Sequence, residues 1–147
     1  MVRKMTIEDY DKVYALWMSI HGFGIRTMDD SREGIERCIK RNPETSAVYE
    51  KDGKIVGAIL CGNDGRRACF YHVCVSEAYR KHGIGRKMGE FCCEQLKKEG
   101  INKVCLNACV TNEVGNKFWQ KMGWTLRDDM NYYDFTLNES TLTDFNK

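Results

Sequence analysis

A group of basic residues and glycines separates a predicted strand from a predicted helix in the stretch from Val73 to Arg86. Gly83 and Gly85 let the backbone approach a ligand closely, because a glycine has no side chain in the way. The unpaired N–H groups of a helix's first turn attract anions, and the helix dipole adds to that attraction. Charged side chains surround the same point: Arg80, Lys81, His82 and Arg86. The pattern favours a bound phosphate or pyrophosphate, and therefore a phosphorylated cofactor.

Two common nucleotide-binding motifs do not account for this turn. A Walker loop requires Gly-x-x-x-x-Gly-Lys-Ser/Thr, a pattern that the sequence lacks. A dinucleotide fingerprint requires a third glycine three residues after the second, where this sequence has Met88. What remains is Arg-x-x-Gly-x-Gly, running from Arg80 to Gly85 between a strand and a helix. This motif resembles the acyl-coenzyme A signature of the GNAT superfamily of N-acetyltransferases.

A second segment carries the same resemblance. The stretch from Asn112 to Trp124 is similar to the family's Asn-x-x-Ala-x-x-x-Tyr-x-Lys-x-Gly-Phe segment, with Gly115 in place of the alanine. Residues 1–17 also look like the family's first strand and helix. Because the likeness spans nearly the whole chain, we expect a single N-acetyltransferase domain over residues 1–147.

The resemblance implies acetyl-coenzyme A (acetyl-CoA) as co-substrate and no metal. Its pyrophosphate would lie on the N–H groups of residues 81–86, and its pantetheine arm along the strand before them. Asn112 would reach the amide arm of the cofactor, although this residue type equally suits a plain helix N-cap. The expected cofactor-binding residues are Val73, Cys74, Val75, Arg80, Lys81, His82, Gly83, Ile84, Gly85, Arg86 and Asn112.

Acyl transfer to an amine requires the amine to be neutral. A lysine-like acceptor costs about 4 to 5 kcal/mol to deprotonate at pH 7, so a general base helps. The strand positions that carry this base in some GNAT enzymes hold Cys69 and Tyr71 here, and Asn107 stands where ribosomal-protein alanine acetyltransferases have a glutamate. Tyr71 or His72 could relay a proton through water, whereas packing in the sheet is the reading we favour for both.

The position of the family's usual general acid holds Trp119 in place of a tyrosine. An indole N–H donates hydrogen bonds but does not release its proton at physiological pH, so Trp119 can only orient or shield the thioester. Tyr132 or Tyr133 could supply the proton, or solvent could protonate a thiolate whose pKa is about 8.5. Core packing is the alternative for these aromatic residues. The candidate catalytic positions are Tyr71, Asn107, Trp119 and Tyr133.

Hydrophobic periodicity and turn signals predict a mixed α/β fold. Helices are expected near residues 6–17, 31–40 and 84–98 and after Asn112, and strands near residues 45–50, 54–61, 67–75, 104–110 and 132–137. The helix at 84–98 acts as a crossover, so the strands on either side of it should be parallel. With the resemblance, the expected fold is a GNAT-like α/β domain. It has a mixed, mostly antiparallel, twisted sheet with a parallel splayed pair in its centre and about four flanking helices.

Two segments have weaker signals. Residues 19–28 contain two glycines and are expected to form a mobile loop, which in the resembling enzymes helps to form the acceptor site. Residues 138–147 are polar and are expected to fray. An exposed edge of the strand near 132–137 would allow a homodimer.

Composition narrows the class of protein. A net charge of +2 over 147 residues is too mild for a nucleic-acid binder, and no apolar run is long enough to cross a membrane. We therefore expect a soluble, cytoplasmic protein with no nucleic-acid or membrane partner. The eight cysteines include no Cys-x-x-Cys pair and fall in predicted strands and helices, which favours small buried thiols over disulfides or metal ligands.

The leading hypothesis is an N-acetyltransferase that moves an acetyl group from acetyl-CoA to a primary amine of a small molecule or peptide. The alternative from another class is an acyl-CoA binding or sensing module without turnover, because the usual base and acid positions are changed. A third possibility is that the basic turn binds some other phosphorylated metabolite.

Overall fold

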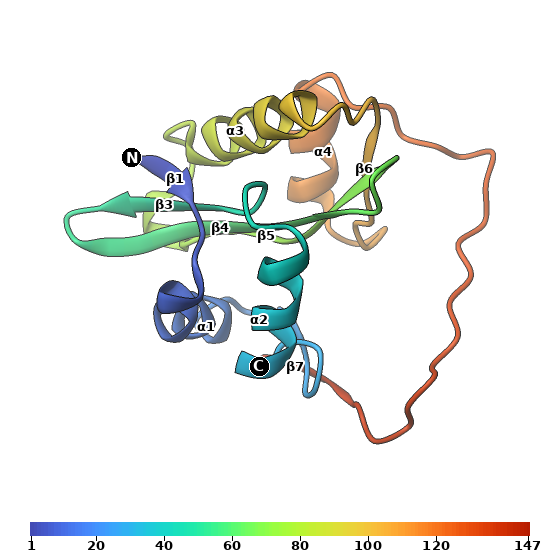
Figure 1. Cartoon of the computed structure of the whole chain (residues 1–147). Helices are drawn as coiled ribbons and strands as arrows, with labels where there is room; N and C mark the ends of the chain where they lie inside the picture. Colours follow the sequence, from blue (N-terminus) through green and yellow to red (C-terminus); the bar gives the residue numbers. More distant parts are fainter. The chain divides into compact units, whose positions relative to one another are not determined.

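The computed structural model describes all residues, Met1–Lys147, and the chain forms two compact units (Figure 1). The first unit comprises Met1–Leu106 together with Ser140–Lys147. It contains both sheets and three of the α-helices. The second unit comprises Asn107–Glu139 and contains α4 (Glu113–Lys121).

The main sheet of the first unit has five strands. Their spatial order is β1 (Val2–Lys4), β3 (Ala47–Lys51), β4 (Lys54–Asn63), β5 (Ala68–Val75) and β6 (Val104–Leu106). All neighbours are antiparallel except β5 and β6, so the predicted mixed sheet and its parallel pair are confirmed. The hairpin turn between β3 and β4 has left-handed backbone at Asp52 and Gly53, as a tight Asp-Gly turn requires.

The parallel pair lies at one end of this sheet, not in its centre as expected, because β6 is the last strand. The strand predicted near 132–137 is absent, and these residues form no regular secondary structure. Their alternating apolar pattern indicates a strand only when a neighbouring strand supplies hydrogen-bond partners. The dimer contact expected through that strand edge therefore loses its basis.

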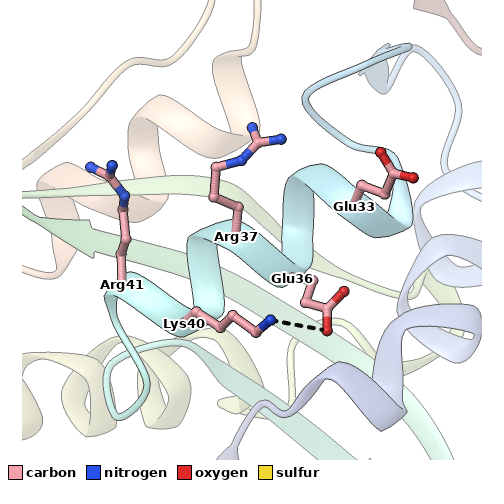
Figure 2. Close-up of a pocket in the computed structure, with 5 residues that line it drawn as sticks. All are labelled: Glu33, Glu36, Arg37, Lys40 and Arg41. Carbon is pink, nitrogen blue, oxygen red and sulfur yellow. Dashed lines mark ion pairs between the residues drawn. The ribbon is translucent and has the colours of Figure 1, made fainter.

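Three helices cover the two faces of the main sheet (Figure 1). The helices α1 (Tyr10–Met18) and α2 (Arg32–Arg41) lie on one face, and α3 (Ile84–Lys98) lies on the other. Two short 3-10 helices, η1 (Ile7–Asp9) and η2 (Glu77–Tyr79), precede α1 and α3 respectively. The outer side of α2 is charged, as Figure 2 shows for residues that include the ion pair Lys40–Glu36.

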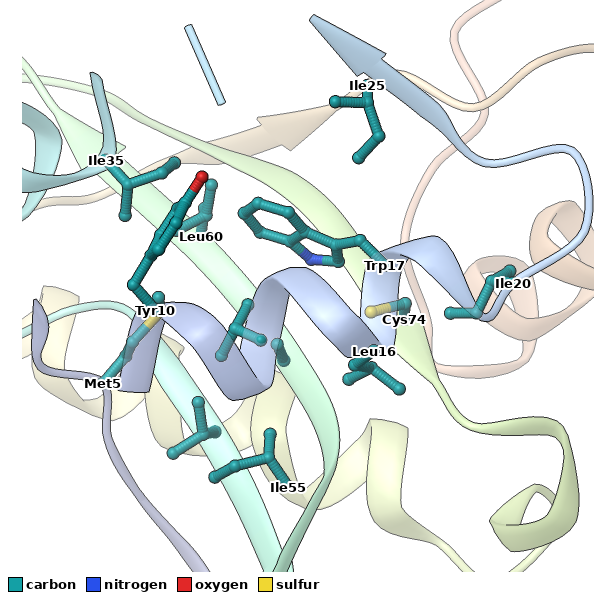
Figure 3. Close-up of a cluster of buried hydrophobic side chains, with 13 residues drawn as sticks. Met5, Tyr10, Leu16, Trp17, Ile20, Ile25, Ile35, Ile55, Leu60 and Cys74 are labelled. Atoms are coloured by element: carbon teal, nitrogen blue, oxygen red, sulfur yellow. The ribbon is translucent and has the colours of Figure 1, made fainter. Parts of the chain in front are cut away.

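The hydrophobic core follows from the helix periodicities. On the α1 face, Val13, Leu16 and Trp17 pack with apolar residues of the sheet into one buried cluster (Figure 3). On the other face, α3 buries one stripe at a spacing of four residues: Ile84, Met88, Cys92 and Leu96. This spacing places the stripe on one side of the helix, the side that contacts the sheet.

The first unit also contains a two-stranded sheet that sequence reasoning missed. The strand β2 (Gly24–Arg26) pairs antiparallel with β7 (Thr143–Phe145), so the predicted mobile loop and the predicted fraying tail hold each other in place. Asn146 strengthens this contact, because its side-chain amide donates to the carbonyls of Trp17 and Ile20 at 2.8 and 2.9 Å. Partners so far apart in sequence leave no local signal.

The cysteines are free thiols, but only some are buried as predicted. Cys61, Cys74 and Cys92 lie in the core, whereas Cys105 and Cys109 are exposed. Cys109 also lies beyond the end of β6, which is shorter than predicted. Burial raises the pKa of Cys61 and of Cys74 to about 12, so both remain protonated, unreactive thiols. None of the helices has the length and apolar character that a membrane crossing requires.

A charged contact fixes the start of α1, and it provides a test of this packing. Asp9 is 6% exposed and accepts two hydrogen bonds from Arg3, at 2.9 and 2.8 Å, and one from the Thr6 N–H at 2.9 Å. Burial raises the pKa of Asp9, but these hydrogen bonds lower it further, so the net pKa lies below its ordinary value. A carboxylate with a depressed pKa stabilises the fold above about pH 4, and this stability is lost as pH falls.

We predict that Asp9→Asn lowers the free energy of unfolding by about 2 kcal/mol at pH 7, because hydrogen bonds to charged groups are lost. The difference from wild type should shrink below about pH 4, where the wild-type carboxylate becomes protonated. Urea unfolding at several pH values measures both effects. Asp11→Asn is the control: Asp11 pairs with Arg32 on the surface, and its loss should change stability by less than about 0.5 kcal/mol. Equal losses of stability in Asp9→Asn and Asp11→Asn would contradict a stabilising role for the buried contact of Asp9 with Arg3.

Candidate functional site

The predicted anion-binding turn is present and leaves backbone N–H groups available. Gly83 is the N-cap of α3 and adopts left-handed backbone with φ +77°. The first α3 hydrogen bond runs from the Lys87 N–H to the Gly83 carbonyl at 3.0 Å, so the N–H groups of residues 84–86 have no acceptor within the helix. Because Gly83 has no side chain, no side-chain acceptor caps them either. These N–H groups can bind an anion.

The basic side chains of the turn have two kinds of environment. Arg80 is held at the end of β5, where its Nε donates to the Val75 carbonyl at 3.0 Å. Arg86 lies 3.8 Å from Glu90 on the surface of α3, and Lys81 is exposed. The exposed side chains of Lys81 and Arg86 can approach an anion at the turn, while Arg80 connects the turn to the strand before it.

The strand that leads into the turn has an open edge. The pairing of β5 with β6 stops at Phe70 and Leu106, where β6 ends, whereas β5 continues to Val75. Residues 71–75 therefore have no partner from β6. The Ser76 N–H bonds to the Val56 carbonyl, which makes the neighbouring pair Gly57 and Val75 a non-hydrogen-bonded one. The N–H and C=O of Val75 thus point away from β4, toward the open edge.

A β-bulge occurs in the same part of β5. Ala58 is paired with Cys74 and Leu60 with Tyr71, so two β5 residues, His72 and Val73, stand opposite Ile59 alone. His72 has φ +51°, which is uncommon for a residue with a side chain. The bulge places two consecutive side chains on one face of the sheet. Tyr71 stands opposite core residue Leu60, and His72 contacts Trp17 of α1 on that same face.

The bulge places His72 against a buried carboxylate. The His72 Nε2 lies 2.8 Å from Oδ1 of Asp30, whose side chain is 7% exposed. The other oxygen of this carboxylate, Oδ2, accepts the Arg26 N–H at 2.7 Å. The imidazole packs against the rings of Trp17 and Phe23, with 4.8 Å between centroids in each case, and these two rings also stack on each other. Sequence reasoning considered His72 but did not predict its contact with Asp30, because the two residues are far apart in the chain.

Tyr71 is not packed in the sheet, contrary to the reading favoured from the sequence: it is 53% exposed. Desolvation, together with the neighbouring Cys69 thiol, raises the pKa of Tyr71 to about 12. Desolvation likewise raises the pKa of Cys69 to about 11. Both groups are protonated at neutral pH, so Tyr71 can donate a hydrogen bond but does not act as a base there.

The remaining predicted site residues belong to the second unit. Asn107 is exposed and lies just after β6, not on a strand as predicted. Asn112 is the N-cap of α4, and its Oδ1 accepts the Gly115 N–H at 2.9 Å. Trp119 is buried and packs against the rings of Phe118 and Trp124. Packing is thus confirmed for Trp119.

The two tyrosines proposed as acids are not packed. Tyr132 and Tyr133 are 70% and 86% exposed, and neither lies on a strand. The packing alternative is therefore wrong for both.

A separate hollow of about 420 Å³ lies along α2 (Figure 2). Its lining consists only of charged side chains from this one helix: Glu33, Glu36, Arg37, Lys40 and Arg41. Ligand sites are usually enclosed and largely apolar, with a few convergent polar groups. This hollow is a space between solvated side chains, and it is not part of the site around β5.

The open edge of β5 and the uncapped start of α3 belong to a region that matches a known family. The acetyltransferase (GNAT) family model matches residues 10–124. The chain belongs to the GNAT acetyltransferase family. The resemblance carried by the Arg80–Gly85 motif is thereby confirmed, and the protein is classed as an acetyltransferase enzyme.

Individual relatives agree with this classification. An acetyltransferase of Sodalis glossinidius is 26% identical over 129 residues, which cover 88% of this chain and 89% of that protein. The crystal structure of a PaiA N-acetyltransferase from Thermoplasma acidophilum, in complex with coenzyme A, superposes with a TM-score of 0.73 at 18% identity. It covers 100% of this chain and 98% of its own.

A third comparison has a similar fold. An aminoglycoside acetyltransferase from an uncultured soil metagenomic sample, in complex with sisomicin, gives a TM-score of 0.73 at 17% identity. The match covers 94% of this GNAT protein and 96% of that chain.

The N-cap role of Asn112 can be separated from a ligand role. We predict that Asn112→Ala accelerates hydrogen exchange at the Gly115 amide and lowers the free energy of unfolding by about 1 kcal/mol, the usual cost of losing a cap. Asn112→Asp keeps the side-chain acceptor and should leave both quantities close to wild type. NMR hydrogen exchange and urea unfolding are the measurements. Unchanged exchange at Gly115 in Asn112→Ala would rule out the cap.

Proposed function

We propose that this GNAT acetyltransferase moves the acetyl group of acetyl-CoA to a primary amine of a small molecule or peptide. The observation that carries the proposal is the juxtaposition of two features in the first unit. The uncapped first turn of α3 follows, after η2, a strand whose last residues, 71–75, have no partner from β6. One long ligand with a diphosphate and an amide-containing arm would satisfy both features.

The first turn of α3 suits the diphosphate. Its N–H groups lack acceptors, and the positive end of a helix of 15 residues reinforces them. Exposed Lys81 and Arg86 add positive charge beside them. The proposed pyrophosphate contacts are therefore the backbone of residues 81–86, including His82, Gly83, Ile84 and Gly85.

The open edge of β5 suits the pantetheine arm. Amide groups of that arm need hydrogen-bond partners, and the outward backbone of Val75 offers them on the side away from β4. The Val75 carbonyl is already bonded to Arg80, so we propose that Val75 contributes its N–H and that Val73 contributes its backbone one step earlier. Cys74 between them is buried and helps to hold the strand in the core.

The chemistry needs a neutral amine and a thiolate that can leave. Tyr71, as a neutral phenol on the open stretch, is proposed as a hydrogen-bond donor toward the reacting groups. A thiol pKa of about 8.5 makes the departing thiolate a tolerable leaving group that solvent can protonate. Trp119 is proposed only to shape its surroundings, because its indole does not release a proton. We further propose a cytoplasmic location, since eight free thiols suit a reducing compartment.

A direct assay tests the function. The protein is incubated with acetyl-CoA and, separately, with polyamines, aminoglycosides, free amino acids and peptides with free N-termini. Release of the coenzyme thiol and mass spectrometry of the acetylated amine are the two readouts. Turnover with at least one amine supports the proposal. Binding of acetyl-CoA without any acetylated product across the panel would favour a binding module and contradict the proposal.

Coenzyme A affinity tests the turn before α3. We predict that Gly83→Ala weakens coenzyme A binding about tenfold, because a side chain in left-handed backbone costs about 1 to 2 kcal/mol and shifts the first turn of α3. Isothermal titration with coenzyme A measures the affinity.

Gly65→Ala is the matched control for this prediction. Gly65 has φ +86°, and, as at Gly83, an added Cβ would meet no atom within 4 Å. Its turn lies between β4 and β5, outside the proposed cofactor site. The control should therefore share the backbone strain and keep the affinity of wild type. Equal affinities for the two variants would overturn the assignment of the turn.

A further inference from the structure

The polar contacts of His72 leave one ring nitrogen available. Nε2 lies 2.8 Å from Asp30, and no protein group bonds to Nδ1. The one buried side-chain nitrogen or oxygen without a partner is Nε1 of Trp17, so Nδ1 of His72 is not sealed in the core. In a neutral imidazole whose Nε2 donates its proton to a carboxylate, Nδ1 carries the lone pair. The ring can thus accept a proton at Nδ1.

Three hydrogen bonds to other residues hold Asp30 in place. Its carboxylate accepts the Arg26 N–H through Oδ2, its own N–H donates to the Arg26 carbonyl at 2.9 Å, and its carbonyl accepts the Tyr10 hydroxyl at 2.7 Å. A carboxylate fixed in this way sets both the orientation and the tautomer of a neighbouring imidazole. Burial of Asp30 without a bonded base would be costly, which is a further reason for the pair to persist.

The pair also lies at the right place along β5. His72 is in the bulge, directly before Val73, on the stretch without a partner from β6. Its left-handed backbone costs energy and is sustained by the packing of the ring against Trp17 and Phe23. Strain that the surroundings maintain in this way is typical of functional positions.

We propose that Nδ1 of His72 is the proton acceptor for the amine substrate and that Asp30 is its positioning residue. This inference rests on the proposed function. The acceptor enters as an ammonium and gives one proton to Nδ1, directly or through one water, from which it passes to solvent. The neutral nitrogen then forms a bond to the acetyl carbonyl carbon, and the carbon–sulfur bond breaks with its electron pair on sulfur. The second proton of the nitrogen ends on the coenzyme thiolate, which completes the balance.

Few other ionisable groups face this ring. Asp30 comes from the segment before α2, and Tyr71 and Cys74 flank His72 on β5 as neutral groups with raised pKa values. On α1, Tyr10 contacts Asp30 through its hydroxyl, and the Arg32 guanidinium lies 5.0 Å from the Tyr10 ring. Asp30 is therefore the charged group in direct contact with the imidazole.

Asp30→Asn separates catalysis from packing, because it preserves the size of the side chain. The Arg26 N–H is a donor, so it bonds to the amide oxygen of the asparagine side chain in this variant. The amide NH2 group then faces Nε2 of His72. Nε2 then accepts, and the imidazole proton moves to Nδ1. Both hydrogen bonds remain, but Nδ1 loses the lone pair that accepts the proton.

We expect Asp30→Asn to lower kcat about a hundredfold or more, the usual contribution of a general base, while the affinity for coenzyme A stays unchanged. Nitrogen NMR of the imidazole should show the change of tautomer. The control is Asp29→Asn, which removes the same charge at the next residue. Asp29 is exposed and bonds only to the Arg26 side chain at 2.8 Å, so this variant should keep wild-type turnover and the wild-type tautomer.

The outcomes separate the two proposals. An active wild type with an Asp30→Asn variant that changes tautomer yet retains its turnover would overturn the role of His72 and leave the acetyltransferase function standing. A wild type that acetylates no amine would overturn both. If Asp30→Asn fails to fold, the pH dependence of the wild-type enzyme is the test. The midpoint of the acidic limb of its kcat/KM profile should equal the midpoint of the NMR titration of His72. Two different midpoints would contradict the proposal.

Discussion

The difference in length between β5 and β6 is the constraint on which the proposed site depends. A parallel partner would occupy the hydrogen-bonding edge of β5 up to its last residue, but β6 ends opposite Phe70. The backbone beyond Phe70 is left with groups on one side that need partners, next to a helix start in the same condition. Only residues 76–83 separate these two backbone regions in the chain. The proposed function assigns one long ligand to both.

The bulge at His72 gives the same strand a second role. A regular strand would turn Tyr71 and His72 to opposite faces, whereas the bulge brings both to the α1 face. In the proposed function, the backbone of β5 holds the cofactor while the side chains of Tyr71 and His72 face the acceptor. Asp30 reaches His72 because the β2–β7 pair and Asn146 hold residues 20–26 against α1. The C-terminal strand β7 therefore contributes to the position of a residue more than 100 positions earlier in the chain.

Features with short-range causes could be predicted from the sequence. The turn before α3, the bounds of α3 and the cap at Asn112 each depend on contacts between residues a few positions apart. The exposure of Tyr71 and the contact between Asp30 and His72 could not be predicted in this way. Both depend on the bulge in β5 and on segments that are far apart in the chain. The strand expected at 132–137 failed for a related reason, since its pattern indicates a strand but not where a partner would come from.

The sequence by itself determined the family, the glycine-containing turn before α3 and the helix that follows it, because glycines, basic residues and a repeat of four residues act through neighbouring backbone. Tertiary structure alone decided where β6 ends, where β5 bulges and which carboxylate meets His72. Those features depend on hydrogen bonds between strands and on the packing of Trp17 and Phe23 around one ring. Residues distant in sequence make these contacts, and their energies exist only once the chain has folded.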